Sequence, residues 1–158
     1  MLLNKHFWFV VFSVIAILLA ATLQSSHMFG IVGIRPDLVL VVLVVLSFFT
    51  ESLVVFSLLV LLGSIGIHFE PGISAEPVAL AVLSLTGFFI KNRAVWPGLA
   101  ATGILLFLGT FALYALIEPS FIYNHFTVVL FEAVYNIVLG LVLFEAISLY
   151  VKKTQFTI

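Results

Sequence analysis

Apolar and polar positions alternate along this chain in long blocks. Six apolar runs stand out, at residues 7–23, 38–50, 53–67, 78–90, 94–117 and 126–151, and the second span is expected to include two preceding residues, as 36–50. Each break between two runs holds a charged residue, a proline or both. Because a helix of about 20 apolar residues crosses the hydrocarbon core of a bilayer, the pattern predicts an all-α integral membrane protein. We expect a compact six-helix transmembrane bundle that forms a single domain.

The second and third runs are short for membrane spans. At about 1.5 Å per helical residue, the apolar stretches 38–50 and 53–67 reach roughly 20–22 Å, which is less than the hydrocarbon thickness. Either the second helix recruits residues 28–34 through a kink at Pro36, or the other helices shelter this pair. Five spans with a re-entrant hairpin are the variant of the six-span interpretation.

The composition agrees with a membrane protein and excludes several functions. Apolar residues make up 64% of the chain and charged residues 8%, against about 45–50% and 25% in soluble proteins. The chain has no cysteine, which excludes disulfides and thiolate chemistry, and its net charge of -1 argues against nucleic-acid binding. Common hydrolase, zinc and phosphate-binding motifs are also absent. We therefore expect no enzyme activity, no catalytic residues, no metal and no cofactor.

The distribution of positive charge predicts the orientation. Cytoplasmic loops carry most of the lysine and arginine in membrane proteins. If the N-terminus is inside and the chain has six spans, Arg35 is the lysine or arginine on the outer face. The others lie on the cytoplasmic face, at Lys5, Lys91, Arg93, Lys152 and Lys153. Both termini are therefore expected in the cytoplasm, and the first run is expected to be an uncleaved anchor.

Two glutamates lie inside the last run. Charged groups within spans are costly and are functional candidates. Glu132 and Glu145 are thirteen positions apart, which places them on nearly opposite faces of a helix, with Glu145 close enough to Lys152 to reach the cytoplasmic boundary. Glu132, Tyr135 and Asn136 form a polar seam, which either bonds a partner or ligand or holds neighbouring helices together.

Small residues mark a helix contact in the fifth run. They recur at three- and four-residue spacing on one face, at Gly98, Thr102, Leu105, Gly109 and Ala112. Such a face lets another backbone approach closely. The other helix belongs either to this chain or to a partner, and a six-span bundle favours packing within the chain.

The break after the third run predicts a turn at the outer surface. Gly63, Gly66 and Gly72 surround it, and His68 lies between two of them with acidic residues nearby. Imidazole and carboxylate groups can bind metals, but the spacing is not that of a known metal site. We therefore expect a solvated loop.

The most individual motif opens the second run. Leu23 and Gln24 close the first run, and the sequence Gly-Ile-Arg-Pro-Asp-Leu follows at residues 33–38. We expect Pro36 and Asp37 in the first helical turn, where proline fits the backbone and a carboxylate favours the positive helix end. Arg35 can then pair with Asp37.

These residues resemble the MreD family of rod-shape-determining membrane proteins. The similarity lies in the chain length, the hydrophobic spans, the Leu-Gln pair, the Gly-x-x-Pro-Asp-Leu motif and the last span with Asn136 followed by Ile-Val-Leu. The resemblance implies a non-enzymatic scaffold subunit of the bacterial elongation complex, in the cytoplasmic membrane. Its implied partners are an MreC-like single-pass protein, RodA, the RodA-associated transpeptidase, MreB and membrane lipids.

The resemblance also supplies an alternative function. MreD-like proteins are similar to the six-helix substrate-binding subunits of energy-coupling-factor vitamin transporters. Such a subunit needs a cavity with a few convergent polar groups, and Glu132, Tyr135 and Asn136 are the sequence's candidates for them. A lipid or ion carrier is a third possibility.

Overall fold

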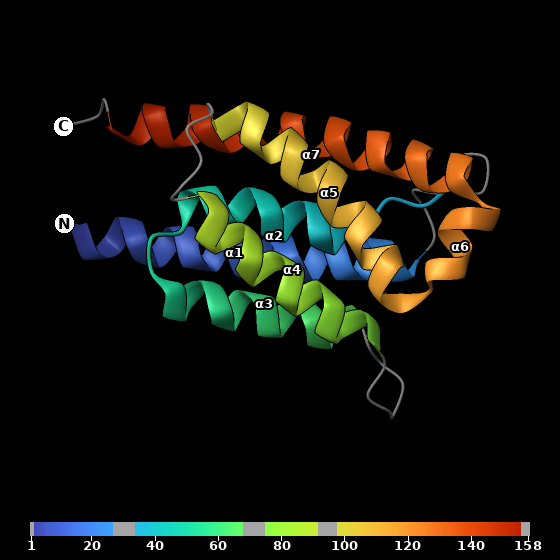
Figure 1. Cartoon of the computed structure of the whole chain (residues 1–158). Coiled ribbons are helices and arrows are strands. Elements are labelled where there is room, and N and C mark those ends of the chain that lie inside the picture. Colours follow the sequence, from blue (N-terminus) through green and yellow to red (C-terminus); the bar gives the residue numbers. More distant parts are fainter. Residues whose placement is uncertain (1, 27–33, 68–74, 92–97, 156–158) are drawn as a thin grey trace.

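The computed structural model describes residues 2–26, 34–67, 75–91 and 98–155. Within these residues the chain is all-helical apart from its turns and connections (Figure 1). The helices are α1 (Leu2–Ser25), α2 (Leu38–Phe49), α3 (Leu53–Ile67), α4 (Ala75–Lys91), α5 (Gly98–Ile117), α6 (Pro119–Asn124) and α7 (Phe126–Gln155).

Six of these helices correspond to the six apolar runs. The third run matches α3 at both ends, whereas α1, α4 and α7 extend beyond the apolar runs into flanking polar residues. The sequence analysis did not predict α6. This helix has 6 residues and begins with a proline, so it is too short to show the apolar periodicity of a helix. Gly63 and Gly66, which precede the predicted turn, lie within α3, and residues 68–74 of that turn lie outside the described part.

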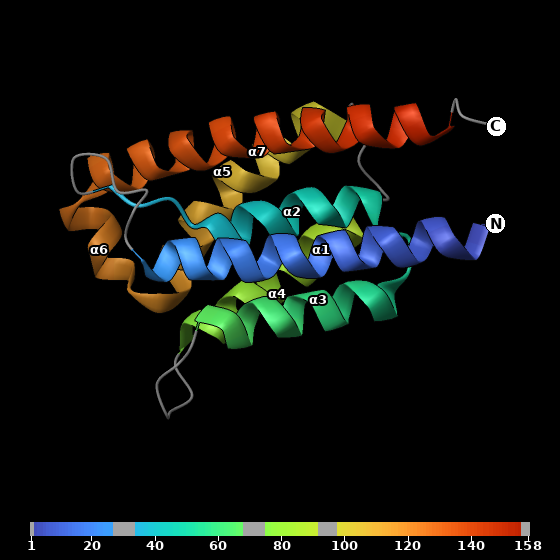
Figure 2. The ribbon, with the colours of Figure 1, turned by 180° about the vertical axis from the view of Figure 1, so that it is seen from behind.

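The short helix α2 lies in the middle of the bundle. It contacts α1, α3, α4, α5 and α7, which surround it in both ribbon views (Figures 1 and 2). Every residue from Val39 to Ser47 is buried. A helix that is apolar on all sides needs such an enclosed position. Of the two explanations for its shortness, the structure therefore supports shelter by the other helices.

The predicted start of the second helix at residue 36 is wrong. Residues 35–37 are not helical, so no continuous kinked helix passes through Pro36, and residues 28–33 of the proposed extension lie outside the described part. Asp37 is instead the N-cap, with φ -82° and ψ 85°. An N-cap carboxylate must accept a hydrogen bond from the first turn, which is why the helix begins after Asp37.

A lysine from α4 binds the other end of α2. The Lys91 ammonium donates hydrogen bonds to the backbone carbonyls of Ser47 and Thr50 and lies 4.0 Å from the centre of the Phe88 ring. Burial lowers the pKa of Lys91, and the charge of Glu51 opposes this shift. Cations stabilise the carbonyl end of a helix, so Lys91 fixes α4 against α2.

Close packing around glycines joins α5 to its neighbours. Thr102 is buried and its hydroxyl donates to the Gly98 carbonyl at 2.8 Å. A Cβ at Gly98 would lie 2.9 Å from Phe144 of α7, and one at Gly109 would lie 3.7 Å from Leu40 of α2. The predicted small-residue face thus packs within the chain.

The tightest contact was not predicted. Gly140 of α7 faces Leu106 of α5 so closely that a Cβ added to the glycine would overlap the leucine side chain.

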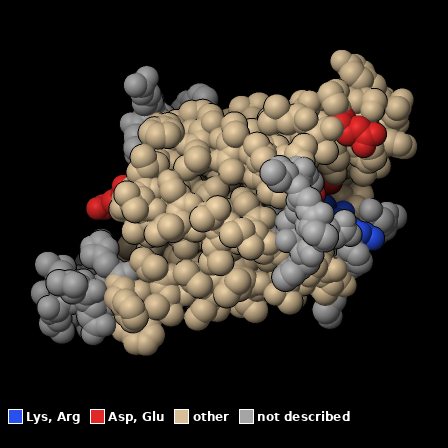
Figure 3. Space-filling view, turned by 90° about the horizontal axis from the view of Figure 1, so that it is seen from below, with Lys and Arg blue, Asp and Glu red and all other residues tan. Residues whose placement is uncertain are grey.

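The outer surface of the bundle is apolar over most of its length. Large side chains on several helices are exposed, including Leu58, Ile65 and Val142, and the face in Figure 3 carries charged groups only toward its two ends. Three described helices are long and apolar enough to cross a membrane, at Phe7–Ser25, Gly98–Ile117 and Phe126–Lys152, and shorter apolar helices accompany them. These features are typical of a membrane protein.

Candidate functional site

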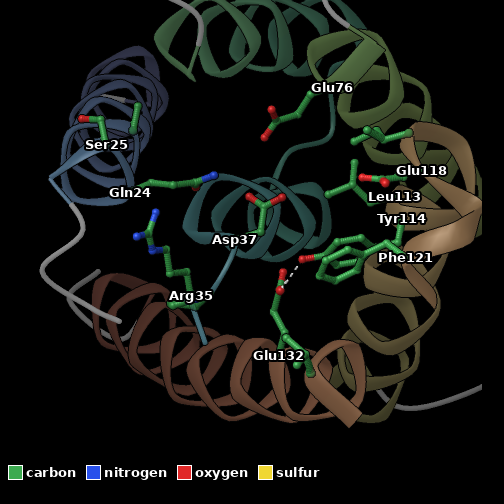
Figure 4. A pocket seen from close by; sticks show the side chains of 14 residues that line it. Gln24, Ser25, Arg35, Asp37, Glu76, Leu113, Tyr114, Glu118, Phe121 and Glu132 are labelled. Atoms are coloured by element: carbon green, nitrogen blue, oxygen red, sulfur yellow. Dashed lines mark hydrogen bonds between the residues drawn. The ribbon is translucent and has the colours of Figure 1, made fainter. Parts of the chain in front are cut away.

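A cavity of about 660 Å³ opens at the end of the bundle opposite the chain termini. Its walls come from α1, the segment before α2, the start of α4, the end of α5, α6 and α7 (Figure 4). The lining residues are Ala21, Gln24, Ser25, Arg35, Pro36, Asp37, Glu76, Leu113, Tyr114, Ile117, Glu118, Phe121, Val128 and Glu132. The cavity thus collects polar residues from distant parts of an apolar chain.

The segment that leads into α2 lines this cavity with Arg35, Pro36 and Asp37. The Asp37 carboxylate accepts a hydrogen bond from the backbone N–H of Leu40 at 3.0 Å. The Gln24 side chain, from the end of α1, accepts one from the N–H of Val39 at 3.1 Å. Both bonds satisfy N–H groups that a helix start otherwise leaves unpaired. The Leu-Gln and Pro-Asp-Leu motifs therefore act on the same helix end.

Asn136 joins this helix end to α5 and α7. Its side-chain oxygen accepts a hydrogen bond from the backbone N–H of Asp37 at 2.9 Å, across 99 residues of sequence. Its amide nitrogen donates to the hydroxyl of Thr110 at 3.0 Å. Asn136 and Thr110 are fully buried, where each unpaired polar group would be costly. One side chain therefore ties three helices together beneath the cavity.

Glu132 points into the cavity one turn from Asn136. The hydroxyl of Tyr114 donates a hydrogen bond to Glu132 Oε2 at 2.6 Å (Figure 4). Tyr114 was not among the residues of the predicted polar seam, which were Glu132, Tyr135 and Asn136. Tyr135 is half-buried on α7 and is not among the residues that line the cavity. Glu145 is exposed while Glu132 is buried, which confirms that the two glutamates occupy different faces.

Among the described residues that line the cavity, acidic groups outnumber basic ones. Asp37, Glu76, Glu118 and Glu132 contribute carboxylates, and Arg35 contributes the guanidinium. Asp37 and Glu132 are only 5% and 6% exposed, whereas Arg35 is exposed. The predicted pair of Arg35 with Asp37 is not formed in the described part of the chain, because the carboxylate is turned toward the N–H groups of α2.

An aromatic wall faces these carboxylates. The rings of Tyr114 and Phe121 are stacked, with centroids 5.1 Å apart and planes 10° apart. The ring of His125 lies 4.7 Å from that of Phe121. This stack holds α6 against α5 and places an aromatic surface on the same side of the cavity as the Tyr114–Glu132 hydrogen bond (Figure 4).

The sequence identified part of this site. Arg35, Asp37, Glu132 and Asn136 were predicted from the motif and from their positions inside a span, whereas Tyr114, Thr110 and Phe121 were missed. Thr110 and Tyr114 are four residues apart and so share one helix face, a signal that an inspection of polar residues in the fifth run would have found. Of the residues considered for a metal loop, His68 and Glu70 lie outside the described part.

The arrangement suits binding. Buried carboxylates, a glutamine and a tyrosine surround a space that also has apolar and aromatic walls. Ligand sites commonly combine an apolar lining with a few fixed polar groups and occupy 300–1,000 Å³. Searches against family models, curated proteins and solved structures found no match to this chain.

Proposed function

We propose that this protein is a non-enzymatic scaffold subunit of a bacterial cell-elongation complex, similar to the MreD family. In this proposal it spans the cytoplasmic membrane six times, keeps both termini in the cytoplasm and binds an MreC-like single-pass protein. RodA, its transpeptidase and MreB would act in the same complex, surrounded by membrane lipids.

One observation carries this proposal. The residues that support the resemblance lie far apart in sequence, yet they meet at one helix end. Gln24 binds the first turn of α2, Asp37 caps it, and Asn136 holds the N–H of Asp37. A motif whose separate parts converge on one structural feature is better support for a family resemblance than the same residues scattered over the surface.

The apolar exterior supports the partner interaction. Large side chains such as Val54, Val82 and Val142 are exposed on different helices, so several faces are available for contact with lipid or with another transmembrane helix. Extramembrane mass is small in the described part, because its helices connect through short segments. A single-pass partner would therefore be held mainly through its span.

The cavity favours a second candidate, a substrate-binding subunit of a small-molecule uptake transporter. Its volume and its mixture of aromatic, apolar and carboxylate groups suit a ligand the size of a vitamin. The two candidate functions predict different co-purifying proteins and different effects of gene deletion, so one set of measurements separates them.

The test is purification of the tagged chain in mild detergent, together with deletion of its gene in the native host. The scaffold function predicts a co-purifying single-pass protein of the cell-shape system and a loss of rod shape on deletion. Co-purification of an ATPase module, tight binding of a vitamin-like ligand and normal shape after deletion would contradict the scaffold and support the transporter.

A further inference from the structure

We infer that the cavity opposite the chain termini binds an organic cation. Its ammonium or guanidinium group would lie between the buried carboxylates and the aromatic wall. This inference goes beyond the scaffold function and holds for either proposed function. It rests on the cavity, on the hydrogen bonding of Glu132 and Asp37 and on the position of the stacked rings.

In the described part of the chain, no basic side chain pairs with the two buried carboxylates. Asp37 and Glu132 are more than nine-tenths buried, and isolated charges are expensive to bury. Arg35 is exposed at the edge of the cavity, and neither Asp37 nor Glu132 forms an ion pair among the described residues. A cation in the cavity would pair with these carboxylates and stabilise their charged form.

Glu132 also keeps an unused acceptor. In the described part of the chain, its hydrogen bond comes from the Tyr114 hydroxyl and ends on Oε2, which leaves Oε1 for another donor. Figure 4 shows this carboxylate and that of Asp37 directed toward the centre of the cavity. A ligand with several N–H donors fits this pair of acceptors, since charge-assisted hydrogen bonds are the strongest available there.

The aromatic wall selects for an organic cation. Tyr114 and Phe121 both line the same cavity. Because their rings stack on each other, a cation would use a ring face outside the stack, within about 6 Å of the ring centre. A bare metal ion would neither use the rings nor fill about 660 Å³. A planar guanidinium or an alkylammonium group can contact the rings, and the organic molecule or side chain that carries it takes up further space in the cavity.

The ligand group has two sources, which share this chemistry. It is either a free small amine or guanidine, or the side chain of a lysine or arginine on a partner. The binding experiments below test whether the cavity prefers a cation, and the crosslinking experiment identifies the source of that cation.

The first test compares methylguanidinium with methylurea, a neutral molecule of the same shape. Binding to the purified full-length chain in nanodiscs is measured by ligand-observed NMR. We expect methylguanidinium to bind at least about tenfold more tightly, because a charge-assisted hydrogen bond contributes at least that much. Equal binding of the two probes would overturn the proposal.

Matched variants locate the bound cation. Glu132→Gln keeps an oxygen for the Tyr114 hydroxyl but removes the charge, and it should abolish the preference for methylguanidinium. Glu145→Gln changes an exposed glutamate of the same helix and should leave the preference intact. Thermal unfolding shows whether each variant is folded. A folded Glu132→Gln variant that keeps the full preference would contradict the assigned site.

The source is identified with a photo-crosslinking amino acid in place of Phe121, combined with mass spectrometry of the purified protein. A crosslink to a lysine- or arginine-containing peptide shows a partner side chain in the cavity. A released small amine without such a crosslink shows a free ligand. If cells yield neither, the proposed occupant is wrong.

Discussion

At the scale of single residues, Asn136 combines two tasks in one side chain. It accepts the N–H of Asp37 and donates to Thr110, and all three residues are buried. An asparagine can do both, because its amide carries an acceptor and two donors. Neither a carboxylate nor an apolar residue of similar size offers this combination.

Replacing Asn136 with leucine should therefore destabilise the protein strongly. The N–H of Asp37 would lose its acceptor and the hydroxyl oxygen of Thr110 would lose its donor, at a cost of about 1–3 kcal/mol, while the Thr110 hydroxyl would still donate to the Leu106 carbonyl. The measurement is reversible unfolding in mixed micelles, followed by circular dichroism. Val138→Ala, at an exposed position on the same helix, is the control and should change stability by less than about 0.5 kcal/mol. Equal effects of the two substitutions would contradict the proposed role of Asn136.

The glutamates of α7 show how far sequence reasoning reaches at this scale. Helical periodicity alone placed Glu132 and Glu145 on different faces, and burial agrees. Periodicity does not say which tyrosine meets a buried glutamate, because this depends on how α5 and α7 pack. The predicted seam grouped Tyr135 with Glu132 and Asn136 because these residues are close in sequence, whereas the hydrogen-bond donor to Glu132 is Tyr114 of another helix.

At the scale of elements, the apolar runs predicted most helices but not their neighbours. The uninterrupted apolar sequence of α2 indicates burial on all sides, and its length indicates shelter by other helices. The five helices that surround it could not be read from the sequence, because each of them is also apolar on several faces. Asp37 was predicted inside the first turn, because proline was given more weight than the capping carboxylate, and the structure places it at the N-cap instead.

The contact between α5 and α7 provides a test at this scale. A Cβ at Gly140 would overlap the fully buried Leu106, whereas a Cβ at Gly103 would lie 3.9 Å from Ile137, an ordinary contact. Gly140→Ala should therefore cost about 1–3 kcal/mol through overpacking. Gly103→Ala should be neutral or slightly stabilising, because alanine favours the helix.

The same unfolding assay compares the two alanine variants. They change the same residue type on facing helices, so helix propensity contributes similarly to both. A Gly140→Ala variant as stable as Gly103→Ala would show that Leu106 has room to move and that this contact does not set the helix distance.

At the scale of the whole molecule, the two ends of the bundle differ in charge. Lys91 and Lys152 lie at the end where α1 begins and α7 finishes, while the acidic cavity lies at the other end. Because lysine and arginine concentrate on the cytoplasmic side, the proposed orientation places the cavity on the outer face of the membrane. A cation from outside the cell, or an outer segment of a partner, could then reach it directly.

The absence of native cysteine allows this orientation to be tested with single introduced thiols. Tyr123 of α6 is 87% exposed beside the cavity, and Lys152 is exposed near the end of α7. We expect a membrane-impermeant maleimide to label Tyr123→Cys in intact spheroplasts, and to label Lys152→Cys only after permeabilisation. Labelling of Lys152→Cys in intact spheroplasts would contradict a cytoplasmic C-terminus. Protection of Tyr123→Cys would place the cavity on the cytoplasmic side, where an extracellular cation or an outer partner segment has no access to it.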